Sequence, residues 1–275
     1  MGRSLVQDKD NALLIDRPEP RGMRVETMPK TGSVGVIEEE WEDLAPETEF
    51  DRYADTYLKV HAENIKVTGE PPAYFAEYKI ADLAQYLSKA QTTPRHITDF
   101  GSGIGNSIPF FREYFPAADL TCVDESTRSI DVAQSRFPGD ETFVLVRSGR
   151  IPIEDASQDV VFSANVFHHI DHDQHQVWLK ELLRIVKPGG LLAIYEHNPL
   201  NPLTVRAVDT CPFDQNAELI ASWKFRRACS QAGWSRARTD YRLFFPHALS
   251  GLRWMEPKLG WLCLGAQYRL LATRV

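Results

Sequence analysis

This sequence of 275 residues has few cysteines, no long apolar run and no excess of basic residues, and each of these absences argues against a class of protein. Its four cysteines are scattered, with no C-x-x-C pair and no suitably spaced histidine, which argues against a disulfide framework and against a zinc site. No apolar run is long enough to span a membrane, and the N-terminus has no secretory signal pattern. Basic residues are too few, 31 against 38 acidic ones, to favour nucleic acid as a partner. We therefore expect a cytoplasmic protein with no metal, no membrane span and no nucleic-acid partner.

The chain has enough apolar material for a core, with 43% hydrophobic and 11% aromatic residues. Residues 1–45 contain prolines and an acidic run but little periodicity, so we expect a flexible N-terminal extension. Aromatic residues at helical spacing follow, Tyr53, Tyr57 and Tyr74 among them, and predict a helical region over 46–92. The remaining residues, 93–275, are expected to form the core domain.

Strand and helix patterns alternate through the core region. Strands are expected at 96–100, 119–124, 142–147, 159–165, 191–196, 239–245 and 266–274, and helices near 105–115, 126–136, 173–187 and 216–232. This alternation predicts an α/β fold with a doubly wound, mostly parallel sheet and crossover helices.

The first expected strand, His96–Phe100, leads directly into Gly101, Gly103 and Gly105. Glycines at this spacing allow positive φ or a close approach to a ligand, and the following helix start leaves amides free to bind it. The turn is typical of a nucleotide-like cofactor site. By itself it fits a nicotinamide-dependent oxidoreductase, a methyltransferase or a plain tight turn.

Two carboxylates narrow these alternatives. Asp124 ends the second expected strand, nineteen residues after Gly105, where a carboxylate meets the two hydroxyls of a ribose. Asp99 precedes the glycine turn, where its charge would repel a pyrophosphate. The pair favours a cofactor that carries an adenosine and an ammonium group.

The segment Asp99–Gly105 resembles motif I of the class I S-adenosylmethionine-dependent methyltransferases. Three later segments, 151–161, 165–170 and 183–190, are similar to further segments of that family. The resemblance covers about residues 96–196 and implies a Rossmann-like sheet of seven strands with an antiparallel last strand and an N-terminal helical lid. It implies S-adenosyl-L-methionine as cofactor. Residues 196–204 and 211–214 are similar to a bacterial subgroup of small-molecule methyltransferases whose substrate is unknown.

Position by position, the resemblance implies that the glycine turn approaches the methionine part of the cofactor, with Asp99 near its ammonium and Asp124 on the ribose. Lys79 matches a place where related enzymes hold the cofactor carboxylate. The family often has an Asp after the third strand for the adenine amino group, and Ser148 stands near there instead. The expected cofactor-binding residues are Asp99, Gly101, Ser102, Gly103, Gly105, Asp124, Ser148, Asn165 and Lys79.

Methyl transfer is an in-line displacement that needs alignment and desolvation but no compulsory side chain. Candidates for a catalytic base and its orienting group lie where the fourth and fifth strands end, namely His168, His169, Glu196 and His197. A neutral imidazole accepts a proton near pH 7, and a carboxylate orients it. Packing or capping is an alternative role for each of these side chains.

The expected activity is methyl transfer to an oxygen or nitrogen of a small molecule, such as a natural-product intermediate or a sugar. The alternatives are a cofactor-binding protein without transfer, a protein methyltransferase and a nicotinamide-dependent oxidoreductase. The loop 198–215, with Asp214, is free to build substrate specificity. Trp254 and Trp261 are expected in the core, with a pocket wall or a homodimer contact as alternatives.

Overall fold

The computed structural model describes residues 63, 65–147, 149–212, 214 and 216–275. The expected flexible extension at 1–45, the aromatic residues Tyr53 and Tyr57, and Ser148 lie outside the described residues. The predictions made for them, and the boundaries of the helical region and the core domain, stay predictions.

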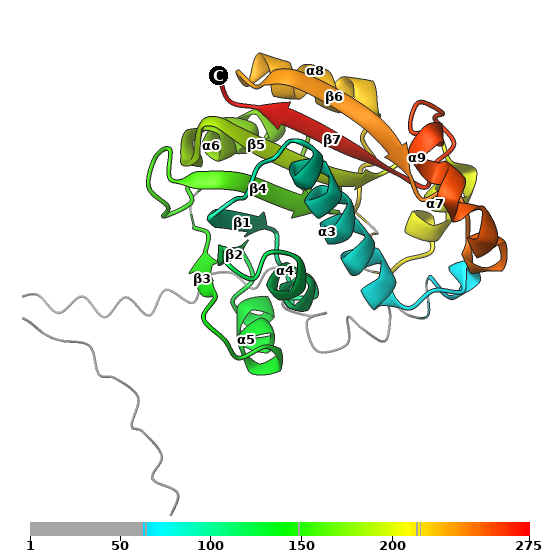
Figure 1. Cartoon of the computed structure of the whole chain (residues 1–275), viewed down its shortest axis with the longest axis horizontal. Helices are drawn as coiled ribbons and strands as arrows, with labels where there is room; N and C mark the ends of the chain where they lie inside the picture. The colour runs from blue at the N-terminus through cyan, green and yellow to red at the C-terminus, as the bar shows by residue number, and fades with distance from the viewer. Residues whose placement is uncertain (1–62, 64, 148, 213, 215) are drawn as a thin grey trace, which may run out of the picture. The chain divides into compact units, whose positions relative to one another are not determined.

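The described residues form one sheet of seven strands in the order β3-β2-β1-β4-β5-β7-β6 (Figure 1). The strands are β1 His96–Phe100, β2 Asp119–Asp124, β3 Thr142–Leu145, β4 Gln158–Ala164, β5 Val186–His197, β6 Ser235–Arg242 and β7 Gln267–Thr273. The pairs from β3 through β5 are parallel, and β7 is antiparallel to both β5 and β6. The predicted Rossmann-like sheet with an antiparallel last strand is confirmed.

Helices cover both faces of this sheet, because its central strands are apolar on both sides. Along β4, Val160 and Phe162 pack into one cluster and Val161 packs into the other, as the two-residue period of a strand requires. One cluster includes side chains of α3 Pro72–Lys89 and α4 Ile108–Tyr114, and the other includes side chains of α6 His175–Ile185 and α8 Ser222–Gln231. Among the described residues, no helix is long and apolar enough to cross a membrane.

Within the expected helical region, the structure describes the short 3-10 helix η1 Lys66–Thr68 and the long helix α3. The α3 side chains Ile80, Leu83 and Leu87 are buried in the core against β1 and α4. The half of α3 from Ile80 onward therefore belongs to the packed domain.

Several element boundaries differ from the expectations, among them β6, which begins at Ser235 rather than 239, and α8, which begins at Ser222 rather than 216. The strand β5 begins at Val186 rather than 191, because Val186 already pairs with Gln158 of β4. An unexpected helix, α7 Pro202–Asp209, lies in the loop after β5. Its sequence signal is clear in retrospect: Asn201 caps it by accepting from the amides of Leu203 and Thr204, and Pro202 stands at the first turn.

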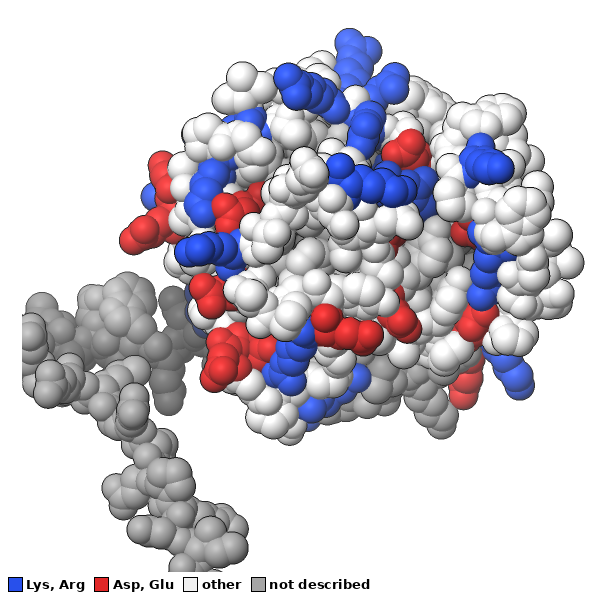
Figure 2. Space-filling view, in the orientation of Figure 1, with Lys and Arg blue, Asp and Glu red and all other residues white. Residues whose placement is uncertain are grey.

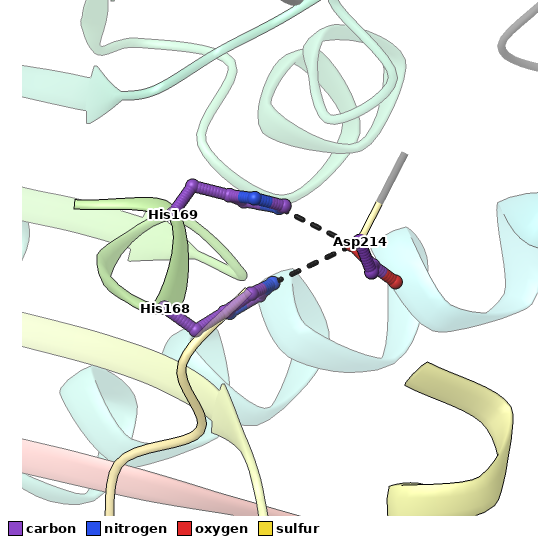
Figure 3. A group of neighbouring side chains, drawn as sticks. All are labelled: His168, His169 and Asp214. Atoms are coloured by element: carbon purple, nitrogen blue, oxygen red, sulfur yellow. Dashed lines mark ion pairs between the residues drawn. The ribbon is translucent and has the colours of Figure 1, made fainter. Parts of the chain in front are cut away.

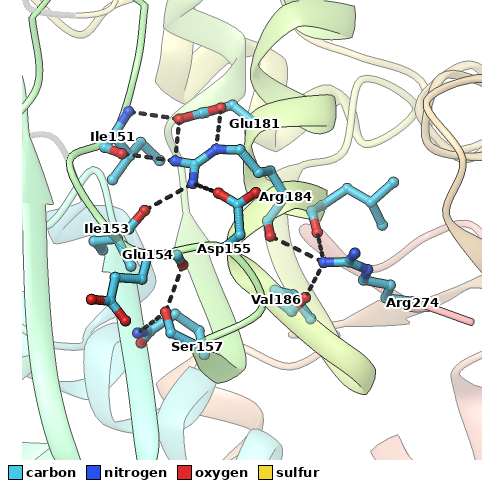
Figure 4. Close-up of polar contacts among 11 residues, drawn as sticks. Ile151, Ile153, Glu154, Asp155, Ser157, Glu181, Arg184, Val186 and Arg274 are labelled. Atoms are coloured by element: carbon cyan, nitrogen blue, oxygen red, sulfur yellow. Dashed lines mark hydrogen bonds and ion pairs between the residues drawn. The ribbon is translucent and has the colours of Figure 1, made fainter.

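The segment that leads into β4 is held by one arginine of α6 (Figure 4). Arg184 donates to the backbone oxygens of Ile151 and Ile153, both at 2.8 Å, and pairs with Glu181 and Asp155. Glu181 in turn accepts from the amide of Ile151 at 2.8 Å. These bonds fix the connection that precedes the fourth strand, and with it the register of β4.

The expectation that Trp254 and Trp261 are buried is wrong. They lie between β6 and β7, in or beside the 3-10 segment η3 His247–Met255 and the short helix α9 Glu256–Leu259, and both are exposed. The buried anchor of this segment is Glu256, which accepts from the Tyr78 hydroxyl and from the amides of Phe244 and Phe245. Both faces of the sheet are already covered by helices, so the core has no place for these two side chains.

Candidate functional site

The carboxyl ends of β1, β2, β4 and β5 meet at one edge of the sheet, because these strands are parallel. In folds of this kind ligands bind outside that edge. The glycine turn follows β1, Asp124 ends β2, Asn165 and the two histidines follow β4, and Glu196 and His197 end β5. All described candidate residues except Lys79 therefore belong to strand ends or to the turns that follow them.

The glycine turn is tied to the end of β2. The amides of Gly101 and Ser102 donate to Val123 O at 2.8 and 3.0 Å, and the amide of Gly103 donates to Asp124 Oδ2 at 2.7 Å. The three glycines have φ values of 76°, 52° and 77°, which lie in the left-handed region that favours glycine. Glycine adopts these φ values without the strain that another residue would carry.

The three glycines nevertheless differ in what surrounds them. A Cβ built on Gly101 would lie 2.3 Å from Val166 Cγ2, and one on Gly105 would lie 2.8 Å from Ile108 Cδ1, whereas one on Gly103 would meet nothing within 4 Å. Gly101 and Gly105 are thus required by packing. Gly103 alone borders open space, where a ligand can approach the backbone.

Asp99 is buried under this turn, and among the described residues its Oδ2 atom has no hydrogen-bond partner. Burial and the charge of Asp124 together raise the pKa of Asp99 to about 7, although the charge of Lys79 opposes the shift. A buried acceptor without a partner is costly, so a cation at this place stabilises it. The group fits the ammonium of the cofactor that the glycine turn implies.

Lys79 is contributed by α3 and is also buried. Burial lowers the pKa of Lys79 to about 8, while the nearby carboxylates of Glu196 and Asp99 oppose the shift. The structure thus places a cation from the helix before β1 within the electrostatic reach of two candidate site residues.

Asp124 and Asn165 stand on either side of β1. Asp124 Oδ1 accepts from the amide of Ser126 at 3.0 Å, so both of its oxygens already orient backbone amides. Asn165 has a φ of 58°, which lets the chain turn sharply after β4, and its amide donates to Tyr195 O at 2.8 Å.

His168 and Glu196 form a buried pair between β4 and β5. The Nδ1 atom of His168 lies 2.6 Å from Glu196 Oε2, and Glu196 Oε1 accepts from the amides of Val166 and Phe167 at 3.0 and 2.8 Å. Burial alone would lower the pKa of His168, but Glu196 and Asp214 raise it to about 9. His168 is therefore a cation held between two carboxylates at neutral pH.

Asp214 joins this pair from the loop after α7 (Figure 3). Its Oδ1 atom lies 3.3 Å from His169 Nε2 and 3.8 Å from His168 Nε2. Burial opposes its ionisation, yet the bonds to the two histidines hold the pKa of Asp214 well below its usual range. Sequence reasoning placed Asp214 only in a specificity loop; the signal that could have found it is the similarity of residues 211–214 to the bacterial subgroup.

The ring of His197 lies beside that of His168, with ring centroids 5.1 Å apart and the planes tilted by 57°. Burial and the positive charge of His168 lower the pKa of His197 to about 3, so this ring is neutral. The expected catalytic residues His168, His169, Glu196 and His197 are thus brought together, but they differ in charge and in accessibility.

One ring nitrogen each of His168 and His169 and a carboxylate oxygen of Asp214 lie within 4.8 Å of one another, a spacing that suits a metal ion as well as a proton. No metal was expected from the sequence. The carboxylates of Glu196 and Asp214 raise the pKa of His168, so a metal at this ring would have to displace a proton.

Comparison with known proteins agrees with this arrangement. Residues 98–194 match a family model described as a methyltransferase domain. This segment is a class I methyltransferase domain. S-adenosylmethionine is the cofactor of this class, and the buried Asp99 beside the open Gly103 provides a fitting place for it.

Outside residues 98–194, the similarity to known proteins is a similarity of fold. A trans-aconitate 2-methyltransferase of Rhodopseudomonas palustris is 31% identical over 111 residues, which is 40% of this chain and 42% of that protein. The chain thus matches less than half the length of this curated relative. A Thermotoga maritima structure described as a possible histamine N-methyltransferase has a TM-score of 0.57 at 18% identity and covers 82% of this chain and 98% of its own.

A second solved structure contains the cofactor. Phosphoethanolamine N-methyltransferase 2 of Haemonchus contortus, in complex with S-adenosyl-L-methionine, has a TM-score of 0.54 at 17% identity and covers 83% of this chain and 60% of its own. At this identity the likeness supports the fold of the methyltransferase domain.

Proposed function

We propose that this protein transfers a methyl group from S-adenosylmethionine to an oxygen or nitrogen of a small molecule. The observation that carries the proposal is the buried, unpartnered Asp99 oxygen under the open Gly103, at the same sheet edge as the His169–Asp214 pair. The first group suits a cationic cofactor, and the second can take up a proton. When bound, the cofactor supplies an activated methyl group on a sulfonium, which is itself the leaving group.

The residues of the cluster divide the work of proton transfer. His169 accepts the proton of the acceptor's hydroxyl or ammonium group, and Asp214, 3.3 Å away, stabilises the imidazolium that forms. His168 is a positioning residue that holds Asp214 from the other side, and Glu196 holds His168. The neutral His197 packs beside them and adds no charge to the site.

The proposal extends to the surroundings of the reaction. A small-molecule acceptor agrees with relatives such as the trans-aconitate 2-methyltransferase, and the excess of acidic residues disfavours nucleic acid. Asn165, Ser102 and Lys79 are proposed to complete the cofactor site, with Lys79 on the cofactor carboxylate. A cytoplasmic location and a homodimer are the corresponding expectations for the whole protein.

His169→Gln is expected to lower kcat by roughly 10²- to 10⁴-fold with little change in cofactor affinity, because a positioned base contributes about that much. Formation of S-adenosylhomocysteine should be measured across a panel of carboxylic acids, phenols and amines. The matched control is His172→Gln, since His172 is a half-exposed histidine paired with Glu218 outside the cluster. Full kcat in the His169→Gln variant would remove the proposed base, and no turnover with any acceptor in the wild type would favour a cofactor-binding protein.

A second candidate is a metal-assisted transfer, which the spacing of His168, His169 and Asp214 favours. The two possibilities separate in one experiment, in which the purified protein is treated with a chelator and its metal content is measured. We expect unchanged turnover and no bound metal, because a metal on His168 would have to displace the proton that Glu196 and Asp214 stabilise there. Stoichiometric metal together with loss of activity on chelation would assign the three ligands to a metal instead.

Cofactor affinity is expected to depend on the protonation of Asp99. Its pKa of about 7 means that the carboxylate that attracts the ammonium is present above pH 7 and is lost as the pH falls. Affinity measured by calorimetry should therefore weaken roughly tenfold for each pH unit below 7. Asp99→Asn should bind weakly and with a flat profile from pH 5.5 to about 7; a wild-type profile as flat as that of the variant would contradict this role.

A further inference from the structure

The segment between β6 and β7 exposes large apolar side chains at the same edge of the sheet as the candidate site. β6 ends and β7 begins at this edge, because β6 runs parallel to β5 and β7 runs antiparallel to it. Trp254 is 68% exposed and Trp261 is 78% exposed. We use the name apolar rim for Leu249, Leu252, Trp254, Trp261 and Leu264, each of which is at least 40% exposed.

The apolar rim lies in a segment that the fold holds firmly from below. Glu256 is buried and accepts three hydrogen bonds, from Tyr78 of α3 and from two backbone amides. Arg253 binds Glu70 at 2.7 Å and lies over the ring of Tyr74. The exposed aromatic and aliphatic side chains are therefore presented by an anchored scaffold.

The segment that carries the apolar rim exposes positive charge and buries its acidic residue. Within residues 246–264, all of which are described, Glu256 is the one acidic residue, and it is buried, while Lys258 is exposed. The ammonium of Lys258 lies 5.9 Å from the ring of Trp254, which places the cation beside the apolar rim. In a chain with a formal charge of -7, the surface over η3 and α9 is mostly white in Figure 2, which means that few charged side chains lie there.

We propose that the apolar rim binds the surface of a bilayer that contains anionic lipid. Tryptophan side chains are favoured at membrane–water interfaces, where the ring is buried and the indole N–H stays hydrated. Lysine beside them is attracted to anionic headgroups. A symmetric contact between two copies would instead bring the same patch and the same lysine against itself, which the charges disfavour.

Such binding turns the edge with the candidate site toward the bilayer. An acceptor with an apolar part could then enter from the lipid side; this consequence rests on the proposed function, whereas the binding itself does not. Vesicle binding is measured without any acceptor, so a failure of the methyl-transfer proposal and a failure of this one are distinguishable.

The test uses the full chain with phosphatidylcholine vesicles, made with and without phosphatidylglycerol. We expect co-sedimentation and a blue shift of tryptophan fluorescence with the anionic vesicles, weakened by salt. The double variant Trp254→Ser/Trp261→Ser should bind at least about tenfold more weakly than the wild type, and Lys258→Glu should bind roughly fivefold more weakly. The matched control is Trp223→Ser, because Trp223 is a half-exposed tryptophan of α8 and should leave binding unchanged.

Three results would overturn the proposal. They are the absence of wild-type binding to either vesicle at low salt, unchanged binding by the double variant, and a dimer that the double variant dissociates while vesicles are not bound. The last result would assign the apolar rim to a second copy of the chain. Calorimetry with the cofactor checks that each variant is folded, and if the double variant is not, the Lys258→Glu comparison decides.

Discussion

Replacing Gly103 with leucine will reduce cofactor affinity by two orders of magnitude or more, about 3 kcal/mol, while the domain stays folded. Only open space surrounds a Cβ at this position, so the added side chain would fill the place where a ligand approaches the backbone. Affinity is measured by calorimetry and folding by thermal unfolding.

The matched control for this substitution is Gly189→Leu. Gly189 also has a positive φ, 82°, and also has nothing within 4 Å of a built Cβ, but it lies near the start of strand β5, away from the glycine turn. Both variants carry a similar backbone strain, on the order of 1–2 kcal/mol. Only the Gly103 variant should lose the cofactor, and equal affinities in the two variants would show that the ligand does not approach this turn.

Glu196→Ala will cost about 3–5 kcal/mol of the free energy of unfolding, because it leaves the buried His168 without its partner and two backbone amides without an acceptor. Glu196→Gln keeps an oxygen for the amides and should cost less, about 1.5–3 kcal/mol. Urea unfolding measures both. Asp155→Ala serves as a control, since it removes a carboxylate that is 72% exposed, and should leave stability nearly unchanged.

The His168–Glu196 pair makes the stability of the folded protein decrease as the pH rises. The pKa of His168 is raised to about 9 in the folded protein, so its contribution is complete below about 6.5 and is lost as the pH rises through 9. In Glu196→Gln this loss between pH 6.5 and about 9 should largely disappear. A wild-type stability that stays level across that range, or a variant that keeps the full decline, would contradict the pairing.

The sheet could be read from the sequence because its signals are local. The expected strands at 96–100 and 119–124 match β1 and β2 residue for residue. A short apolar run that ends in a glycine turn or a helix cap strongly predicts a buried strand. The helix α7 was not predicted, although the sequence contains a recognisable N-cap for it, Asn201 before Pro202. The exposure of Trp254 and Trp261 could not be predicted from the sequence, because burial depends on which other helices already cover the sheet.

By itself the sequence determined the class of fold and the cofactor, since Asp99, the glycine turn and Asp124 lie within one short stretch whose order of residues carries the chemistry. Only the tertiary structure decided that Gly103 alone among the three glycines borders open space, and that Asp214 meets His168 and His169. The physical reason is distance along the chain. Free space beside Gly103 depends on what Val166 and Ile108 fill elsewhere, and Asp214 reaches the histidines through a loop that no local pattern positions.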